Sequence, residues 1–461
     1  MRLIDLDMLR KAGWPTWPCF PSVMHRSLRL NIAAGFFGMF WICAPLGAPL
    51  PLLMQAVEAS STQLGLLSAA WQAAMLAQIP AALFVERFSR RKPMWVTVTT
   101  LHRILWAAPA VVPWLWPNER SWWPVALIVA LSLSNLLANL GTASWLSWMA
   151  DIVPVDRAGR FWAVRQSVLS IGLVLGTAWY GWLMDRYSSG ESVLGFQWVF
   201  ALCSVFGILD IVVHSFVHEP PMEKAAESAP VLRRLAAPFE TPGFLKLTLL
   251  MAFWTCSQSL VGYTLAMPGF FGMVHLRETF GASYSQASLI FISAALGGAF
   301  FSRILGPWMD RAGAVAVMTR LAVLTPLSMM AWWCASPGSV QIAGQAWPVA
   351  VVWMTVAASV QGALCTGALL CQFRLAQMFT SGSGRTVAMA VHWSIAGVGG
   401  AVGGIGGGWL KDVLQRGGYL CGSWHAFDVL VLLSVLLSWG AVVPLCRKLA
   451  LPTEAETCGV T

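Results

Sequence analysis

Long apolar segments recur along the whole chain, and they limit most strongly how it can fold. Each is about 20 residues or longer, enough for a helix to cross a hydrocarbon layer of about 30 Å. The segments lack the strict alternation of a lipid-facing barrel. The sequence therefore predicts an all-α membrane protein with twelve transmembrane helices. Their approximate ranges are 30–55, 63–85, 93–116, 122–149, 161–184, 193–216, 246–272, 284–308, 314–335, 346–372, 386–410 and 424–446.

The composition excludes several classes of function. Hydrophobic residues make up 57% of the chain and charged residues 11%, which is more apolar surface than a soluble core of this length could cover. The net charge of +9 is divided among alternate loops, so no nucleic-acid partner is expected. The 10 cysteines include no CxxC pair. We also find no HExxH or GxSxG motif, and expect neither enzyme activity, nor a cofactor, nor a metal.

The distribution of Lys and Arg predicts the orientation in the membrane. One set of alternate loops holds Arg87, Arg90, Arg91, Lys92, Arg157, Arg160, Lys224, Arg233, Arg234, Arg311, Arg374 and Arg385. The other set holds Arg120, Arg186, Arg277, Lys411 and Arg416. Loops rich in Lys and Arg remain on the cytosolic side. We therefore expect a multi-pass protein of a cytoplasmic (inner) membrane with both termini in the cytosol.

The two halves of the chain carry similar motifs in the same order, which indicates an internal repeat. The pair Glu86-Arg87 recurs 224 positions later as Asp310-Arg311. The segments 59–63 (ASSTQ) and 282–286 (ASYSQ) also correspond, as do Asp185 and Asp412. We predict a cytosolic leader (1–29), a first six-helix bundle (30–216), a cytosolic linker (217–245), a second six-helix bundle (246–446) and a cytosolic tail (447–461). Two such bundles are typical of carriers with a site between the halves.

These motifs resemble those of the major facilitator superfamily. Its signature between the second and third helices reads Gly-x-x-x-Asp-Arg-x-Gly-Arg-Arg/Lys. The first copy has Ala82, Glu86, Arg87, Ser89, Arg90 and Arg91 at the corresponding positions, and the second keeps Gly306, Asp310, Arg311 and Gly313. The first copy thus lacks both glycines, and the second lacks the trailing cations. The resemblance covers Arg29 to Lys448 and implies two pseudo-symmetric bundles that work by alternating access.

The acid–Arg loops are candidates for gating. An acid near a helix N-terminus is stabilised by about 0.3–1 kcal/mol when it is exposed. The repeat suggests that Glu86 faces Arg385 and that Asp310 faces Arg160, which would hold the cytosolic side shut. The alternative is that these residues only order their loops. The predicted gating residues are Glu86, Arg87, Arg90, Arg91, Arg160, Asp310, Arg311 and Arg385.

Polar residues deep in the predicted helices are candidates for substrate binding, because they are costly in lipid. They are Asn135, Asn139 and Thr142 in the fourth helix, Gln258 in the seventh, Gln361 in the tenth, Arg103 in the third and His392 in the eleventh. No acidic residue is expected at the depth of Arg103, so either a substrate anion or structural hydrogen bonds would satisfy it. His392 could titrate or be a core histidine. The neutral residues could equally join helices to one another.

The sequence thus predicts secondary-active or facilitative transport of a small organic solute by alternating access, with or without a coupling ion. We expect a monomer surrounded by membrane lipids. The alternative is a non-transporting membrane protein of the same fold, such as a receptor or an assembly factor.

Overall fold

The computed structural model describes residues 22–85, 90–153, 158–220, 230–262, 270–379, 385–418 and 424–449. The first half of the chain forms α2 (Ser22–Leu46), α3 (Pro49–Ala56), α4 (Ser61–Ala73), η1 (Ala74–Ala77), α5 (Gln78–Val85), α6 (Lys92–Leu105), α7 (Ala108–Leu115), η2 (Arg120–Trp122), α8 (Trp123–Ile152), α9 (Ala158–Tyr187) and α10 (Leu194–Ser215). The second half forms α11 (Val231–Ala236), η4 (Ala237–Glu240), α12 (Phe244–Leu260), α13 (Phe270–Phe280), α14 (Tyr284–Ala312), α15 (Ala314–Met329), η5 (Met330–Cys334), β1 (Ser339–Ile342), β2 (Gln345–Pro348), α16 (Val349–Phe379), α17 (Arg385–Gly417), α18 (Ala426–Leu437), η6 (Ser438–Val442) and α19 (Val443–Arg447).

The predicted fold class is confirmed, with one refinement of the helix count. Among the described residues, ten helical segments are long and apolar enough to cross a membrane. The other two predicted spans, 93–116 and 246–272, are each divided into two shorter helices, α6 with α7 and α12 with α13. Pro109 opens α7, and Gly262 after α12 has φ +78°. Both residues are suited to a break in a helix. The boundaries of the leader, linker and tail stay predictions.

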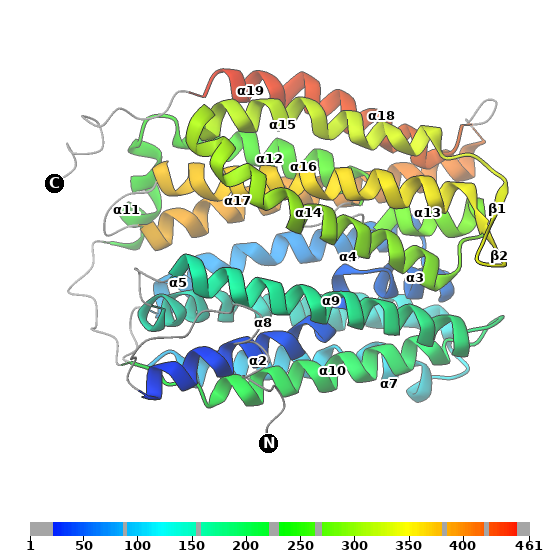
Figure 1. The fold of residues 1–461 in the computed structure, drawn as a ribbon, viewed down its shortest axis with the longest axis horizontal. Helices are drawn as coiled ribbons and strands as arrows, with labels where there is room; N and C mark the ends of the chain where they lie inside the picture. The colour runs from blue at the N-terminus through cyan, green and yellow to red at the C-terminus, as the bar shows by residue number, and fades with distance from the viewer. Residues whose placement is uncertain are drawn as a thin grey trace.

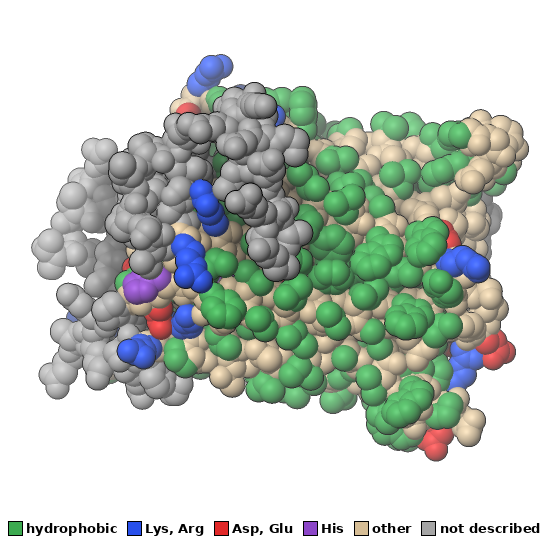
Figure 2. Space-filling view, turned by 60° about the horizontal axis from the view of Figure 1, so that its bottom comes forward, with side chains coloured by type: hydrophobic (Ala, Val, Ile, Leu, Met, Phe, Trp, Pro, Cys, Tyr) green, Lys and Arg blue, Asp and Glu red, His purple; other side chains and the backbone are tan. Residues whose placement is uncertain are grey.

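The helices run along the long axis of the molecule, with the first half below the second in Figure 1. One end, which we call the hairpin end, carries the antiparallel strands β1 and β2. Their turn, Ala343-Gly344, has positive φ at both residues, as a tight hairpin requires. The opposite end, which we call the basic end, carries α11 and the described residues Arg90, Lys92 and Arg374. Hydrophobic side chains cover the surface between the two ends, and charged ones gather near the ends (Figure 2).

The buried hydrophobic core joins the two halves at the hairpin end. One cluster there contains Leu53 and Phe200 of the first half together with Phe271 and Phe291 of the second. Towards the basic end, the buried core of the described residues consists of two clusters, one in each half, and Ile79 and Leu83 of the first half pack against the cluster of the second. Contacts between halves pair α17 with α4, η1 and α5, α9 with α14, and α3 with α13. The molecule is therefore closed between its halves at the hairpin end.

Helix α17 packs through glycines on two faces. Gly399, Gly403 and Gly407 face α12, and a Cβ added at these positions would lie 2.1, 2.2 and 2.3 Å from its backbone oxygens. Gly400, Gly404 and Gly408 face α4, across the boundary between the halves. Small residues four apart allow helices to approach this closely. The run of glycines therefore serves one contact within a half and one contact between halves.

The two kinds of glycine predict different costs of substitution. Gly403→Ala would place Cβ 2.2 Å from the carbonyl oxygen of Cys256, so backbone must move. We expect a loss of about 1–3 kcal/mol in unfolding free energy, which is typical of overpacking. Gly406 has no atom within 4 Å of an added Cβ, so Gly406→Ala is the matched control and is expected to be neutral or stabilising by up to about 1 kcal/mol. Thermal unfolding in detergent measures both, and equal melting temperatures would contradict the assignment.

Candidate functional site

Two carboxylates join the halves at the hairpin end. Each belongs to one half and accepts hydrogen bonds from the start of a helix in the opposite half. Asp185, near the end of α9, accepts hydrogen bonds from the backbone N–H groups of Tyr284 (2.7 Å) and Ser285 (2.9 Å) at the start of α14. The hydroxyl of Ser283 donates to the same carboxylate at 3.2 Å. The first N–H groups of a helix have no partner within the helix, so a carboxylate there satisfies them and complements the helix dipole.

The second carboxylate repeats this arrangement in the opposite direction. Asp412, near the end of α17, accepts hydrogen bonds from the N–H groups of Ser61 (2.9 Å) and Thr62 (2.8 Å) at the start of α4. The hydroxyl of Thr62 adds a third hydrogen bond at 2.5 Å. We call these two contacts, Asp185 with the start of α14 and Asp412 with the start of α4, the hairpin-end latches.

The sequence around each latch explains why the helices begin where they do. Ser60 and Gln63 form a capping box at α4, and Ser283 and Gln286 form the same box at α14. Each box satisfies further N–H groups of its first turn and leaves the remaining ones facing the carboxylate. The sequence analysis found both segments and both acids through the repeat, but it predicted gating at the other end. The signal was present as S-x-x-Q paired with an acid at the end of a distant helix.

The predicted gating residues at the basic end are only partly described. Glu86 and Arg87, and the side chains of Arg160 and Arg385, lie outside the described residues. Asp310 forms an ion pair with Arg374, and both belong to the second half. Arg311 is exposed. The predicted contacts between halves at this end stay predictions.

The two remaining predicted gating residues belong to the first half. Arg91 is buried, and its Nη2 lies 2.6 Å from Asp151 Oδ2 at the end of α8. Arg90 is exposed. The ion pair of Arg91 thus joins the start of α6 to the end of α8 within one half.

A small cavity of about 60 Å³ lies between the halves. Its wall contains Gln72 of α4 in the first half and Trp254, Gln258, Gln372 and Trp393 of the second half. A cavity of this size has room for only a few waters. The residues that line it are uncharged. The site can therefore donate and accept hydrogen bonds and can contact a flat ring, but it supplies no counter-ion.

Two amide nitrogens at this cavity are buried without a hydrogen-bond partner among the described residues. The Nε2 atoms of Gln258 and Gln372 have no hydrogen-bond partner among the described residues, although these side chains are only 8% and 3% exposed. An unsatisfied buried amide costs about 1–3 kcal/mol. A ligand that supplies acceptors recovers this free energy, so the two amides are candidates for recognising one.

The structure places one predicted binding residue, Gln258, in the wall of the cavity. Asn139 instead accepts a hydrogen bond from Gln78 at 2.8 Å, and Thr142 bonds to its own helix. His392 is buried, with Nδ1 3.2 Å from the hydroxyl of Thr248. The other residues that are absent from the cavity wall are Asn135, which is buried on α8, and Gln361, which is buried on α16.

Gln72, Gln372 and Trp393 were missed by the sequence analysis. Gln372 is the most informative case, because the predicted span ended at 372 whereas α16 continues to Phe379. Its amide is therefore deep in the helix, and not at its end. A search for every amide within a membrane helix would have found both glutamines.

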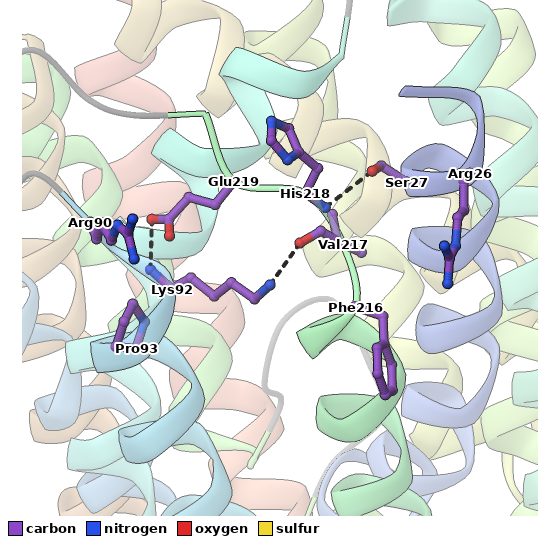
Figure 3. Close-up of a pocket in the computed structure, with 9 residues that line it drawn as sticks. All are labelled: Arg26, Ser27, Arg90, Lys92, Pro93, Phe216, Val217, His218 and Glu219. Atoms are coloured by element: carbon purple, nitrogen blue, oxygen red, sulfur yellow. Dashed lines mark hydrogen bonds between the residues drawn. The ribbon is translucent and has the colours of Figure 1, made fainter. Parts of the chain in front are cut away.

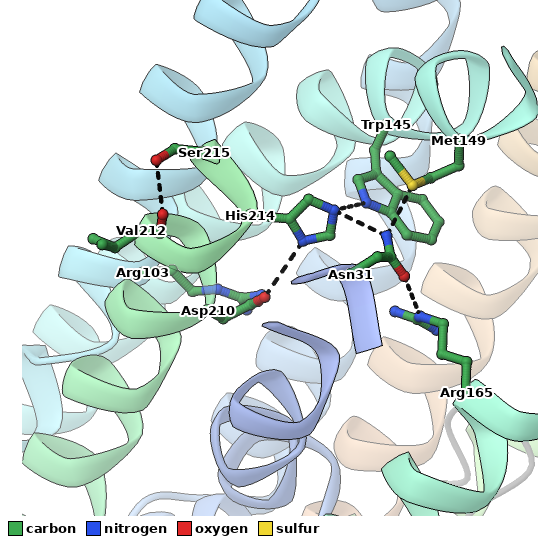
Figure 4. Close-up of polar contacts among 9 residues, drawn as sticks. All are labelled: Asn31, Arg103, Trp145, Met149, Arg165, Asp210, Val212, His214 and Ser215. Atoms are coloured by element: carbon green, nitrogen blue, oxygen red, sulfur yellow. Dashed lines mark hydrogen bonds and ion pairs between the residues drawn. The ribbon is translucent and has the colours of Figure 1, made fainter. Parts of the chain in front are cut away.

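Arg103 corrects an expectation of the sequence analysis, because it has an acidic partner. Its Nη2 lies 3.0 Å from Asp210 Oδ2 on α10, and both side chains are 10% exposed. The guanidinium also lies 3.5 Å from the ring centre of Trp41. The two side chains come from α6 and α10 and point toward one another (Figure 4). The expectation that no acid lies within reach of Arg103 is therefore wrong.

The ion pair belongs to a polar network inside the first half (Figure 4). His214 Nδ1 lies 3.8 Å from Asp210 Oδ1. Its Nε2 lies 3.1 Å from both Asn31 Nδ2 and the indole N–H of Trp145. An indole N–H can only donate, so Nε2 is the acceptor and a neutral ring carries its proton on Nδ1, towards Asp210. Arg165 Nε donates to Asn31 Oδ1 at 2.8 Å. The network joins α2, α6, α8, α9 and α10.

Comparisons with known proteins place this geometry in context. The family model of the Major Facilitator Superfamily matches residues 30–275, just over half of the chain. A comparison with curated proteins finds no match. Among solved structures, a mutant of the nucleoside transporter NupG is similar, with a TM-score of 0.65 and 14% identity over 91% of this chain and 99% of that one.

Two further solved structures share the fold. An auto-inhibited peptide transporter of the POT family has a TM-score of 0.66 and 14% identity over 94% of this chain and 98% of that one. A fucose:proton symporter of E. coli, FucP, has a TM-score of 0.58 and 12% identity over 92% of this chain and 98% of that one. At these identities the likeness is one of fold.

Proposed function

Since the chain belongs to the major facilitator superfamily, we propose that it carries a small, uncharged polar solute across a membrane by alternating access. The observation that carries the proposal is the cavity between the halves, whose wall contains two glutamine amide nitrogens without a partner among the described residues. Residues from both halves contribute to it. A relative movement of the halves would therefore open and close the cavity.

The hairpin-end latches supply the second element of such a cycle. They hold the halves together at the hairpin end. Because each carboxylate and its helix start belong to different halves, all hydrogen bonds of a latch break when the halves move apart at this end. The proposed orientation puts the basic end in the cytosol, as its Lys and Arg residues favour. In that orientation the described state is closed towards the outside.

The lining of the cavity favours an uncharged solute with hydroxyl or amide groups and a ring. Amide side chains bond both donors and acceptors, and tryptophan faces stack on rings. The similar structures are those of a nucleoside transporter, a fucose:proton symporter and a peptide transporter. Nucleosides and sugars fit a wall without charged residues better than peptides, whose termini are ionised. The alternative of a non-transporting receptor finds no support in these neighbours.

The test is thermal unfolding of the purified protein in detergent against a panel of nucleosides, sugars and dipeptides. A ligand at about 100 times its Kd stabilises the folded state by about 2.7 kcal/mol. In Gln258→Leu and Gln372→Leu we expect roughly 10-fold weaker binding for each lost hydrogen bond, or about 1.4 kcal/mol.

The matched control is Gln341→Leu, because Gln341 is exposed on β1, away from the cavity. Uptake of the stabilising compound into proteoliposomes then distinguishes transport from binding. Stabilisation by dipeptides alone would contradict the uncharged class. Binding without uptake in either orientation would contradict transport.

A further inference from the structure

A second cavity, of about 690 Å³, lies at the basic end of the first half. It is formed by the start of α2, the start of α6 and the segment that follows α10 (Figure 3). Its volume falls within the range of small-molecule sites, about 300–1,000 Å³. It is separate from the cavity between the halves, with which it shares no residue.

Among the described residues that line this cavity, positive charges outnumber negative ones. Arg26, Arg90 and Lys92 contribute three cations, and Glu219 contributes the one carboxylate among the lining residues. That carboxylate is already engaged, because its Oε1 accepts hydrogen bonds from the backbone N–H groups of Arg91 and Lys92 at the start of α6. No carboxylate among the described residues forms an ion pair with Arg26 or Arg90, and both side chains are exposed.

Lys92 is held in place but retains donors. Its ammonium donates to the carbonyl oxygen of Val217 at 2.9 Å. An ammonium has three N–H donors, so two others are available. The hydroxyl of Ser27 accepts a hydrogen bond from the N–H of His218, which fixes the far wall of the cavity (Figure 3). The result is a preformed, cationic pocket with fixed walls.

The surface next to the pocket is apolar and belongs to a membrane-spanning helix. Phe216, which lines the pocket, is 64% exposed. Val212 and Val205 on α10 are 48% and 59% exposed. Their spacing of four and seven residues places all three on one face of the helix. An apolar stripe therefore runs from the pocket along the outside of the hydrophobic span.

We propose that this pocket binds the phosphate headgroup of an anionic phospholipid, whose acyl chains lie along the stripe of Phe216, Val212 and Val205. The cations meet the phosphate, and the adjoining stripe meets the hydrocarbon. Clusters of Lys and Arg at the cytosolic face of membrane proteins bind anionic headgroups in this way. A free phosphate would use the same cations but not the stripe, and this difference separates the two sources.

The test compares phosphatidylglycerol with phosphatidylcholine of the same acyl chains, added to the full-length protein in detergent. Native mass spectrometry counts bound lipids, and thermal unfolding follows stabilisation. We expect phosphatidylglycerol to bind and stabilise at concentrations where phosphatidylcholine does neither. In the double variant Arg26→Gln/Arg90→Gln we expect roughly 30-fold weaker binding, from the loss of two cations near the membrane surface.

The matched control is Arg233→Gln/Lys246→Gln, which removes the same charge from exposed residues of the second half. Equal weakening in both double variants would overturn the proposal, because the attraction would then be general. Equal binding of the two lipids would overturn it as well. Stabilisation by inorganic phosphate at the same phosphate concentration would assign the pocket to a soluble anion instead of a lipid. Phe216→Ser, with the cations intact, is expected to weaken lipid binding alone.

Discussion

Replacing Asp185 and Asp412 together with alanine is expected to open the hairpin end. Each carboxylate accepts three hydrogen bonds at the start of a helix in the other half. Loss of a helix cap costs about 0.5–2 kcal/mol, so both losses amount to about 1–4 kcal/mol against the closed state. This shifts the ratio of open to closed molecules roughly 5- to 900-fold.

Distances between labels at this end measure the shift. Cysteines at Ser189 in the first half and Gln341 in the second carry spin labels. The background lacks the exposed Cys334 and also Cys19, Cys421 and Cys458, which lie outside the described residues. The double variant is expected to show a longer distance than the parent.

Asp428→Ala is the matched control for the latches, because Asp428 accepts a hydrogen bond from His425 at the start of its own helix, within one half. Its distance distribution is expected to equal that of the parent. An unchanged distribution in the double latch variant, or an equal change in the control, would refute the role of the latches.

The second large effect is expected from breaking the buried pair of Arg103 and Asp210. Asp210→Asn leaves the guanidinium of Arg103 buried without a counter-ion. Removing one partner of such a pair costs about 3–5 kcal/mol, and it would be measured as a loss of unfolding free energy in detergent. Transport is expected to fall only in proportion to the folded fraction, because Arg103 and Asp210 do not line the cavity between the halves.

Two further variants separate a buried charge from a general effect of charge removal. The double variant Arg103→Met/Asp210→Leu removes both charges together and is expected to recover most of the loss. Glu191→Gln breaks the exposed pair with Arg120, in which Glu191 is 92% exposed, and it is expected to change stability by at most about 1 kcal/mol. If Asp210→Asn were as mild as Glu191→Gln, the pair would not be structurally important.

Much of the fold could be predicted from the sequence because its signals are local. The length of an apolar run decides whether a helix crosses a membrane, and the excess of Lys and Arg decides which loops gather at one end. The division of two predicted spans into α6 with α7 and α12 with α13 was harder to predict from the sequence. Pro109 and Gly262 are compatible with an unbroken span, because proline and glycine are frequent in membrane helices. Whether they break it depends on packing around them.

The site was harder to predict because it depends on which helices meet. The acids Asp185 and Asp412 were found through the repeat, but sequence alone could not pair them with helix starts about 100 and 350 residues away. Asp210 seemed to lie too near a helix end to reach Arg103. Depth counted along a single helix ignores side-chain length and the opposite direction of its neighbour.

The hairpin-end latches have a consequence for which substitutions the sequence can accept in evolution. Four of their six donors are backbone N–H groups, which no substitution except proline removes. The hydroxyl of Thr62 can therefore be gained or lost without removing its latch, whereas Ser283 also caps α14. An exchange at Thr62 adjusts the stability of the closed hairpin end. Thr62 does not line the cavity between the halves, so this stability and the solute preference that we propose for the cavity can change independently of each other.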